Sequence, residues 1–338
     1  MMIRTIAACL FAGVMSMAVA QSPAPSGANA TTATQTTSPQ VARADAPNPL
    51  QPGNNAPVWR EVRQGEAGYA SLPAREAGVL ILTSGQTWRT IRNGPVTWIG
   101  GGLVIAVVLA LAAFYLLKGP IRLNEAPTGR RVLRFKHIER LAHWTTAISF
   151  VVLAVTGLLM LFGKHVLMPV LGHTVHGWIV ILGKNVHNFV GPVFSVALVF
   201  VILIFLRDNL PTARDWLWIK KGGGLFTGEH VPSGRFNAMQ KMLFWGGVVA
   251  LGVIVTITGY VLDFPNFNQL RATMQTMHLV HTIAALLFVA MMLGHIYIGT
   301  IGMEGALDAM KTGYVDESWA KEHHEDWYHE VKTSQRPT

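Results

Sequence analysis

The chain has 338 residues, of which 51% are hydrophobic and only 13% charged, which is the composition of a membrane protein. Its one cysteine, Cys9, excludes disulfides, iron–sulfur clusters, covalent haem attachment and cysteine zinc sites within this chain, so that a metal needs His, Met or carboxylate ligands. The net charge of +9 is compatible with nucleic-acid binding, but basic residues in a membrane protein more often record topology, and we expect no nucleic-acid partner.

The N-terminal region shows three kinds of sequence. Residues 1–20 have an early arginine, an apolar stretch and a small-residue ending, which predicts a signal peptide. A lipoprotein signal at Cys9 is disfavoured because almost no apolar region precedes it. Residues 21–57 are rich in Ala, Ser, Thr and Pro and predict a disordered periplasmic tether. Residues 58–95 are mixed and predict a periplasmic segment that packs on a neighbour or on the membrane surface.

Long apolar runs follow, each near the ~20 residues that cross a bilayer core. They predict five spans: Val96–Leu117, Leu141–Phe162, His187–Leu206, Met242–Leu262 and Met277–Ile301. Lys and Arg number seven in the connection 118–140 and six in 207–241, whereas the opposite connections hold only Lys164, Lys184 and Arg271. The positive-inside rule therefore places both basic connections and the tail 302–338 in the cytoplasm. We expect a multi-pass protein of the bacterial inner membrane with a periplasmic mature N-terminus.

This topology assigns a depth to each histidine in a span. His187 and His281 lie near the outer side, and His143 and His295 lie near the cytoplasmic side. His281 and His295 are fourteen residues apart, which is about 21 Å along a helix and nearly the same face. The sequence thus predicts two histidines at each of two levels inside one bundle.

Inward histidines on facing helices are how a bundle holds a metal or cofactor. Haem b suits them, because bis-histidine ligation needs no cysteine and the apolar walls suit the macrocycle. A helix–helix hydrogen bond explains a single intramembrane histidine as well, but four at two matched depths favour haem. His278 lies one turn before His281 and could replace it, although the fourteen-residue spacing to His295 favours His281.

The remaining histidines predict no ligand role. His173 and His176, in "LGHTVHGW", are expected in the outer loop, at the surface or at the edge of a haem. His323, His324 and His329, in "KEHHEDWYHE", are expected in a solvated helical tail.

Several motifs between Arg134 and Glu330 together resemble one family. In chain order they are "ERLAHWTTAISFVVLAVTG", "KNVHNFVGP", "GRFNAMQKMLFW", "HTIAALLFVAMMLGHIYIG" and "KEHHEDWYHE". They are similar to the gamma (cytochrome b556) subunits of respiratory formate dehydrogenases. The resemblance implies an all-α, four-helix dihaem cytochrome b core at 141–301, with the helix 96–117 as an addition. It also implies the same pairs, His187 with His281 and His143 with His295.

The resemblance further implies a quinone site beside the cytoplasmic haem, which carries over onto Asn237 and Gln240 of "FNAMQK". Without it, the two residues read equally well as polar residues at a helix N-terminus. The implied partners are an iron–sulfur (beta) subunit, a molybdenum or tungsten (alpha) subunit that oxidises formate, and the quinone pool. This chain would then transfer electrons without itself oxidising formate. The alternatives are the cytochrome b subunit of a membrane hydrogenase or thiosulfate reductase, and, in another class, a haem-free transporter or assembly protein whose histidines relay protons.

Overall fold

The computed structural model describes residues 56–64, 83–222, 231–267 and 269–334. The predicted signal peptide and nearly all of the predicted tether lie outside the described residues. The chain divides into two compact units. One consists of residues 1–89 and 269–276 and includes helix α2 (Ala56–Gln64). The other consists of residues 90–268 and 277–338 and holds the helical bundle.

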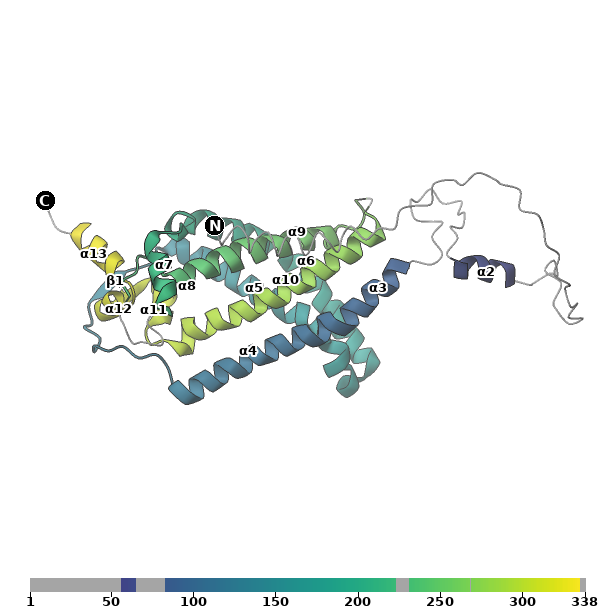
Figure 1. Cartoon of the computed structure of the whole chain (residues 1–338), viewed down its shortest axis with the longest axis horizontal. Helices are drawn as coiled ribbons and strands as arrows, with labels where there is room; N and C mark the ends of the chain where they lie inside the picture. Colours follow the sequence, from purple (N-terminus) through teal and green to yellow (C-terminus); the bar gives the residue numbers. More distant parts are fainter. Residues whose placement is uncertain (1–55, 65–82, 223–230, 268, 335–338) are drawn as a thin grey trace, which may run out of the picture. The chain divides into compact units, whose positions relative to one another are not determined.

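The bundle is built from long apolar helices and short connecting elements, which lie lengthwise beside one another in Figure 1. Helix α3 (Thr83–Ile91) belongs mostly to the first unit. Up to the third long helix, the elements of the bundle in chain order are η1 (Arg92–Val96), α4 (Thr97–Lys118), β1 (Arg131–Leu133), α5 (His137–Val166), α6 (Met168–Phe205) and η2 (Arg207–Asn209). The elements that follow are α7 (Ala213–Lys220), α8 (Ala238–Met242), η4 (Leu243–Leu251), α9 (Gly252–Asp263), α10 (Arg271–Tyr297) and η5 (Ile298–Gly302). The C-terminal elements are α11 (Ala306–Lys311), β2 (Tyr314–Asp316), α12 (Glu317–His323) and α13 (Glu325–Ser334).

Five helical runs among the described residues are long and apolar enough to cross a membrane. They are 84–118, 137–166, 168–205, 238–263 and 271–302, and each contains or closely matches one predicted span. Many apolar side chains on these helices are exposed, as Leu117 (83%) and Phe189 (81%) show. A helix satisfies its own backbone hydrogen bonds, so such a surface is stable against lipid. The predicted all-α membrane bundle is confirmed.

Small residues set how closely the helices approach. A methyl group at Gly100 of α4 would clash with Leu286 Cδ1 of α10, and one at Gly252 of α9 would lie 3.1 Å from Leu198 of α6. Glycine at both positions lets the helices approach without displacing these leucine side chains, as is common between membrane helices. The added helix α4 also contacts α10 through Phe114 and Tyr115, whose rings stand edge-on to Tyr297.

The connection before the third predicted span is helical, and the expectation of an outer loop at His173 and His176 is wrong. α6 begins at Met168 and continues through a kink at Gly172, whose φ is +75°. The residues between His176 and Lys184 are mostly apolar. They extend the helix on the N-terminal side of the predicted span, which begins at His187.

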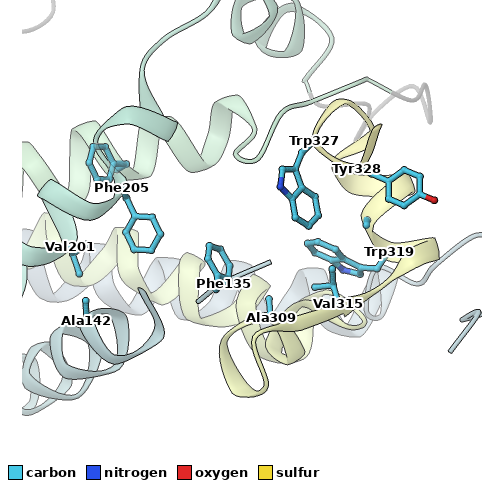
Figure 2. Packing of buried hydrophobic residues seen from close by; sticks show 11 residues of the cluster. Phe135, Ala142, Val201, Phe205, Ala309, Val315, Trp319, Trp327 and Tyr328 are labelled. Atoms are coloured by element: carbon cyan, nitrogen blue, oxygen red, sulfur yellow. The ribbon is translucent and has the colours of Figure 1, made fainter. Parts of the chain in front are cut away.

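A strand before α5 and the elements after η5 fold together into a small layer. We call this layer the C-terminal cap, and it consists of β1, α11, β2, α12 and α13. Strand β1 pairs antiparallel with β2, Arg131 opposite Asp316 and Leu133 opposite Tyr314. Figure 2 shows Trp319, Trp327 and Tyr328 of the cap gathered with Phe135, while Phe205 and Ala142 continue the same apolar cluster into the bundle.

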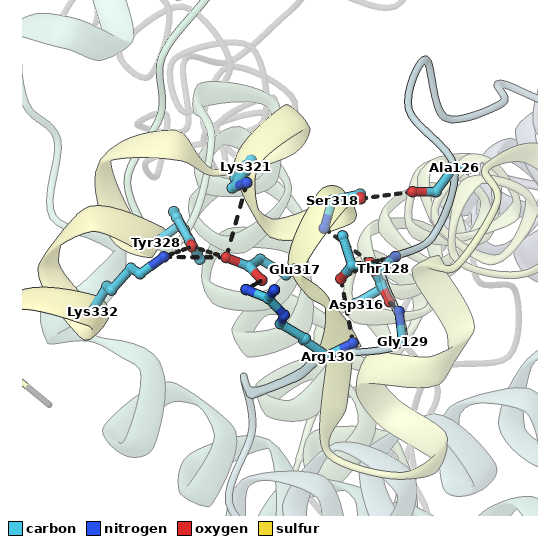
Figure 3. A network of polar contacts seen from close by, with 10 residues as sticks. All are labelled: Ala126, Thr128, Gly129, Arg130, Asp316, Glu317, Ser318, Lys321, Tyr328 and Lys332. Carbon is cyan, nitrogen blue, oxygen red and sulfur yellow. Dashed lines mark hydrogen bonds and ion pairs between the residues drawn. The ribbon is translucent and has the colours of Figure 1, made fainter.

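Two consecutive carboxylates join β2 to α12 and anchor this cap. Asp316 accepts hydrogen bonds from the backbone of Thr128, Gly129 and Ser318, and Glu317 accepts one from the Tyr328 hydroxyl (Figure 3). The expectation of a solvated tail is therefore wrong for its central part. Trp319, Ala320 and His324 are buried, while His329 remains exposed.

Candidate haem-binding site

The four histidines predicted to act as ligands meet in two pairs. The rings of His187 on α6 and His281 on α10 have centroids 6.2 Å apart and planes inclined by 72°. The rings of His143 on α5 and His295 on α10 have centroids 6.2 Å apart and planes inclined by 65°. The ring that His187 meets is thus that of His281.

The spacing within each pair fits one metal ion between two imidazoles. Metal–imidazole bonds of about 2 Å on both sides of one ion place the ring centroids roughly 6.3 Å apart. His143, His187 and His281 are half-buried, and they lie on helices that are apolar along most of their length. Paired imidazoles between apolar helices suit a bis-histidine haem b.

The outer histidines are oriented by threonines of neighbouring helices. Thr156 Oγ1 of α5 lies 2.9 Å from His187 Nδ1, and Thr258 Oγ1 of α9 lies 3.0 Å from His281 Nδ1. With Nδ1 engaged, the other ring nitrogen of each histidine is left for a metal. Such a bond from the distal ring nitrogen fixes the orientation of a ligating histidine.

Each of these threonines is followed by a glycine that lies close to the ring. A methyl group at Gly157 would lie 3.4 Å from His187 Cε1, and one at Gly259 would lie 3.4 Å from His281 Cε1. The rings therefore rest against the backbone of α5 and α9. Sequence reasoning missed both threonines, although the dipeptide Thr-Gly occurs in both "VLAVTG" and "VTITG" and could have pointed to them.

The inner pair has a different environment. His143 Nδ1 is buried and has no hydrogen-bond partner among the described residues. One turn earlier, Arg140 donates to the carbonyls of Met310, Lys311 and Thr312, which ties α5 to the end of α11. The inner level thus borders the C-terminal cap.

Asn237 and Gln240 begin helix α8 and cap it reciprocally. The Asn237 side-chain oxygen accepts from the Gln240 backbone N–H at 3.0 Å, and the Gln240 side-chain oxygen accepts from the Asn237 backbone N–H at 3.0 Å. This is the helix-terminal role that the sequence left open as an alternative. Since both side-chain oxygens are engaged, the NH₂ group of each side chain is the part suited to donate to another molecule.

The remaining candidates are placed as follows. His173 is exposed, and His176 lies on α6 next to Gly163 of α5. His278 is half-buried on α10. His324 accepts from Arg134 at 2.9 Å, donates to the Gly234 carbonyl at 2.7 Å and lies 3.5 Å from the Ser233 hydroxyl, and so serves the C-terminal cap.

Comparison with known proteins agrees with this site. The model of the prokaryotic cytochrome b561 family matches residues 134–313, which contain all four paired histidines. The cytochrome b556(fdo) subunit of formate dehydrogenase from Escherichia coli K12 is 30% identical over 205 residues, which cover 60% of this chain and 93% of the relative.

Two further relatives show the same extent of similarity. The nitrate-inducible cytochrome b556(Fdn) subunit from Escherichia coli K12 is 29% identical over 212 residues, 61% of this chain and 94% of the relative. The formate dehydrogenase cytochrome b556 subunit of Haemophilus influenzae is 27% identical over 212 residues, 61% of this chain and 86% of the relative. Helical architecture, paired histidines and these matches together show that the chain belongs to the prokaryotic cytochrome b561 family, whose members are membrane proteins that carry haem b.

Proposed function

We propose that this chain is the membrane cytochrome b subunit of a formate dehydrogenase complex and passes electrons from a partner subunit to a quinone. The observation that carries the proposal is that four histidines meet in two pairs on membrane-spanning helices. In each pair the ring centroids are 6.2 Å apart. When bound, haem b supplies a one-electron iron centre at each of the two levels. The relatives named as formate dehydrogenase subunits support the choice of complex.

In this proposal His187 and His281 form the outer level, and His143 and His295 form the inner level. The distribution of Lys and Arg supports a periplasmic mature N-terminus and a cytoplasmic C-terminal cap. The partners are then an iron–sulfur subunit at the outer level and, beyond it, a molybdenum or tungsten subunit that oxidises formate. Moving one negative charge inward is worth about 2.3 kcal/mol per 100 mV of membrane potential.

The quinone is proposed to bind near α8, at the cytoplasmic end of the bundle. A quinone carbonyl needs hydrogen-bond donors, and the side-chain NH₂ groups of Asn237 and Gln240 can supply them. Both residues are half-buried at the start of a membrane helix, where water can deliver protons. Reduction at this face consumes cytoplasmic protons and adds to the membrane potential.

The haem content of two variants tests the ligand assignment. His281→Ala should lower the haem content from two haems per chain to one. His278→Ala, one turn away on the same helix, is the matched control and should keep two. Pyridine-haemochrome stoichiometry and reduced-minus-oxidised spectra of the purified protein give the counts. A loss in the His278 variant only would move the ligand to His278, and a colourless wild-type protein would exclude the proposal in favour of a haem-free transporter.

The donor role of Asn237 can be separated from its capping role. Asn237→Asp keeps the oxygen that caps α8 but removes the NH₂ donor. We expect a quinone-reduction rate lower by about tenfold, the equivalent of one hydrogen bond of about 1.4 kcal/mol, with both haems retained. An unchanged rate would leave Asn237 as a capping residue only. Formate-dependent haem reduction in the native complex tests the partner, since a hydrogenase or thiosulfate reductase subunit would not respond to formate.

A further inference from the structure

We propose that Thr156 and Thr258 are positioning residues that hold the outer ligands in one tautomer and keep the outer haem at a lower reduction potential than the inner haem. The inference rests on the proposed two-haem function. It assigns a task to two hydroxyl groups that are not themselves ligands.

Hydrogen-bond geometry favours one direction for both Thr–His bonds. A threonine hydroxyl has one hydrogen to donate. The Thr156 hydroxyl lies 2.8 Å from the Val152 carbonyl, and the Thr258 hydroxyl lies 2.6 Å from the Ile254 carbonyl, and a carbonyl only accepts. When each hydroxyl donates to that carbonyl, it accepts from the histidine. In this arrangement the Nδ1 atoms of His187 and His281 carry the proton.

This direction decides which nitrogen is available to iron. A neutral imidazole has one protonated and one bare nitrogen, so a proton on Nδ1 leaves Nε2 bare. Ligation requires the bare nitrogen. Thr156 and Thr258 thus prepare both outer rings for ligation through Nε2, whereas the opposite tautomer would lose a hydrogen bond within the membrane.

The two levels differ in this respect. Both outer ligands have an acceptor at Nδ1, while His143 Nδ1 of the inner pair is buried without a partner among the described residues. An acceptor at the distal N–H makes an imidazole a more basic ligand. A more basic ligand stabilises ferric iron and lowers the reduction potential, which axial ligands and their hydrogen bonds control. The outer level is therefore the weaker electron acceptor, and electron transfer inward is downhill.

The arrangement occurs twice, which argues against a chance contact. Thr156 and Gly157 on α5 receive a histidine of the following helix α6, and Thr258 and Gly259 on α9 receive a histidine of the following helix α10. In both cases the threonine bonds Nδ1 at 2.9–3.0 Å and the glycine faces Cε1 at 3.4 Å.

Redox titration of the purified protein tests the proposal. Thr156→Val and Thr258→Val replace the hydroxyl by a methyl group of similar size, and Thr146→Val is a control, since the Thr146 hydroxyl of α5 bonds only its own helix at Ala142. We expect the lower-potential haem of either variant to move upward while the higher-potential haem stays. A tenfold change in the ratio of reduced to oxidised outer haem at a fixed ambient potential corresponds to 59 mV.

Each outcome is decisive. If both haems are present and neither potential moves, or if the higher one moves instead, the proposal is overturned while the two-haem function stands. If a valine variant loses one haem, Thr156→Ser and Thr258→Ser decide. Serine keeps the hydroxyl, so haem restored at the wild-type potential supports the hydroxyl's role, and haem still missing overturns it. A wild-type protein without two haems would instead refute the proposed function.

Discussion

Acidification should loosen the C-terminal cap through one buried residue, His324. This side chain is 1% exposed and is held between two partners. Its Nδ1 lies 2.7 Å from the Gly234 carbonyl and must donate to it, because a carbonyl only accepts. Its Nε2 lies 2.9 Å from Arg134 Nη2 and must accept, because a guanidinium only donates. The folded cap therefore requires neutral His324.

Burial is the main cause that lowers the pKa of His324 well below its usual value, and the nearby charge of Arg134 lowers the pKa further. Protonation at Nε2 would direct an N–H group at the guanidinium. The unfolded segment has an ordinary histidine pKa of about 6.5, so below that pH it binds a proton that the folded cap excludes. Stability is therefore intact above about pH 6.5 and falls with acidification, by about 2 kcal/mol at pH 5.

Hydrogen exchange of the full-length protein in detergent micelles measures this loss. Amides of α12 and α13 should open more readily at pH 5 than at pH 7.5 by about 2 kcal/mol after correction for intrinsic exchange rates. His324→Gln, which can still donate and accept, should remove most of the pH dependence. Equal opening free energies at the two pH values in the wild type, or an unchanged slope in the variant, would refute the reasoning.

Three further predictions concern packing. Gly259→Val should displace the ring of His281 and cost one haem per chain, which the reduced spectrum measures; a full haem content would contradict the contact at 3.4 Å. Glu139→Gln should lower the free energy of unfolding by about 1–2 kcal/mol, because it removes the buried charge that pairs with Arg235 at 2.9 Å while Asp208 remains a partner of Arg235, and an unchanged melting temperature would contradict this. Gly100→Val should cost about 1–3 kcal/mol by overpacking α4 against α10, while both haems remain; haem loss would show that α4 supports the core.

The sequence predicts the bundle and the histidine pairs because both depend on one-dimensional rules. Apolar run length identifies spans, charge asymmetry orients them, and helical rise then gives each histidine a depth. In the structure the rings of His281 and His295, both on α10, each meet a histidine ring of another helix, as their fourteen-residue spacing predicts. The choice of His281 over His278 depended on that spacing and agrees with the geometry.

What the sequence could not predict depends on contacts between distant segments. β1 and β2 are separated by about 180 residues, and neither three-residue strand has a periodic pattern of its own. The burial of His324 depends on Arg134 and Gly234, which lie on two other segments, so "KEHHEDWYHE" alone reads as a solvated helix. The threonines were missed because a threonine in an apolar helix commonly bonds the carbonyl four residues earlier, which both of them also do.

Helix α10 has a special position in this design, because it carries one histidine of each pair. The remaining two come from α6 at the outer level and α5 at the inner level. One helix therefore sets the distance between the levels, about 21 Å along its axis. At one end a threonine of α9 bonds the ring of His281, and at the other end, beyond His295, the helix passes into the wider turn of η5, which begins at Ile298. Such wide turns are frequent at functional sites. The level of His187 and His281 is thus held by hydrogen bonds to its ligands, whereas the level of His143 and His295 lies about one turn before the helix changes its winding.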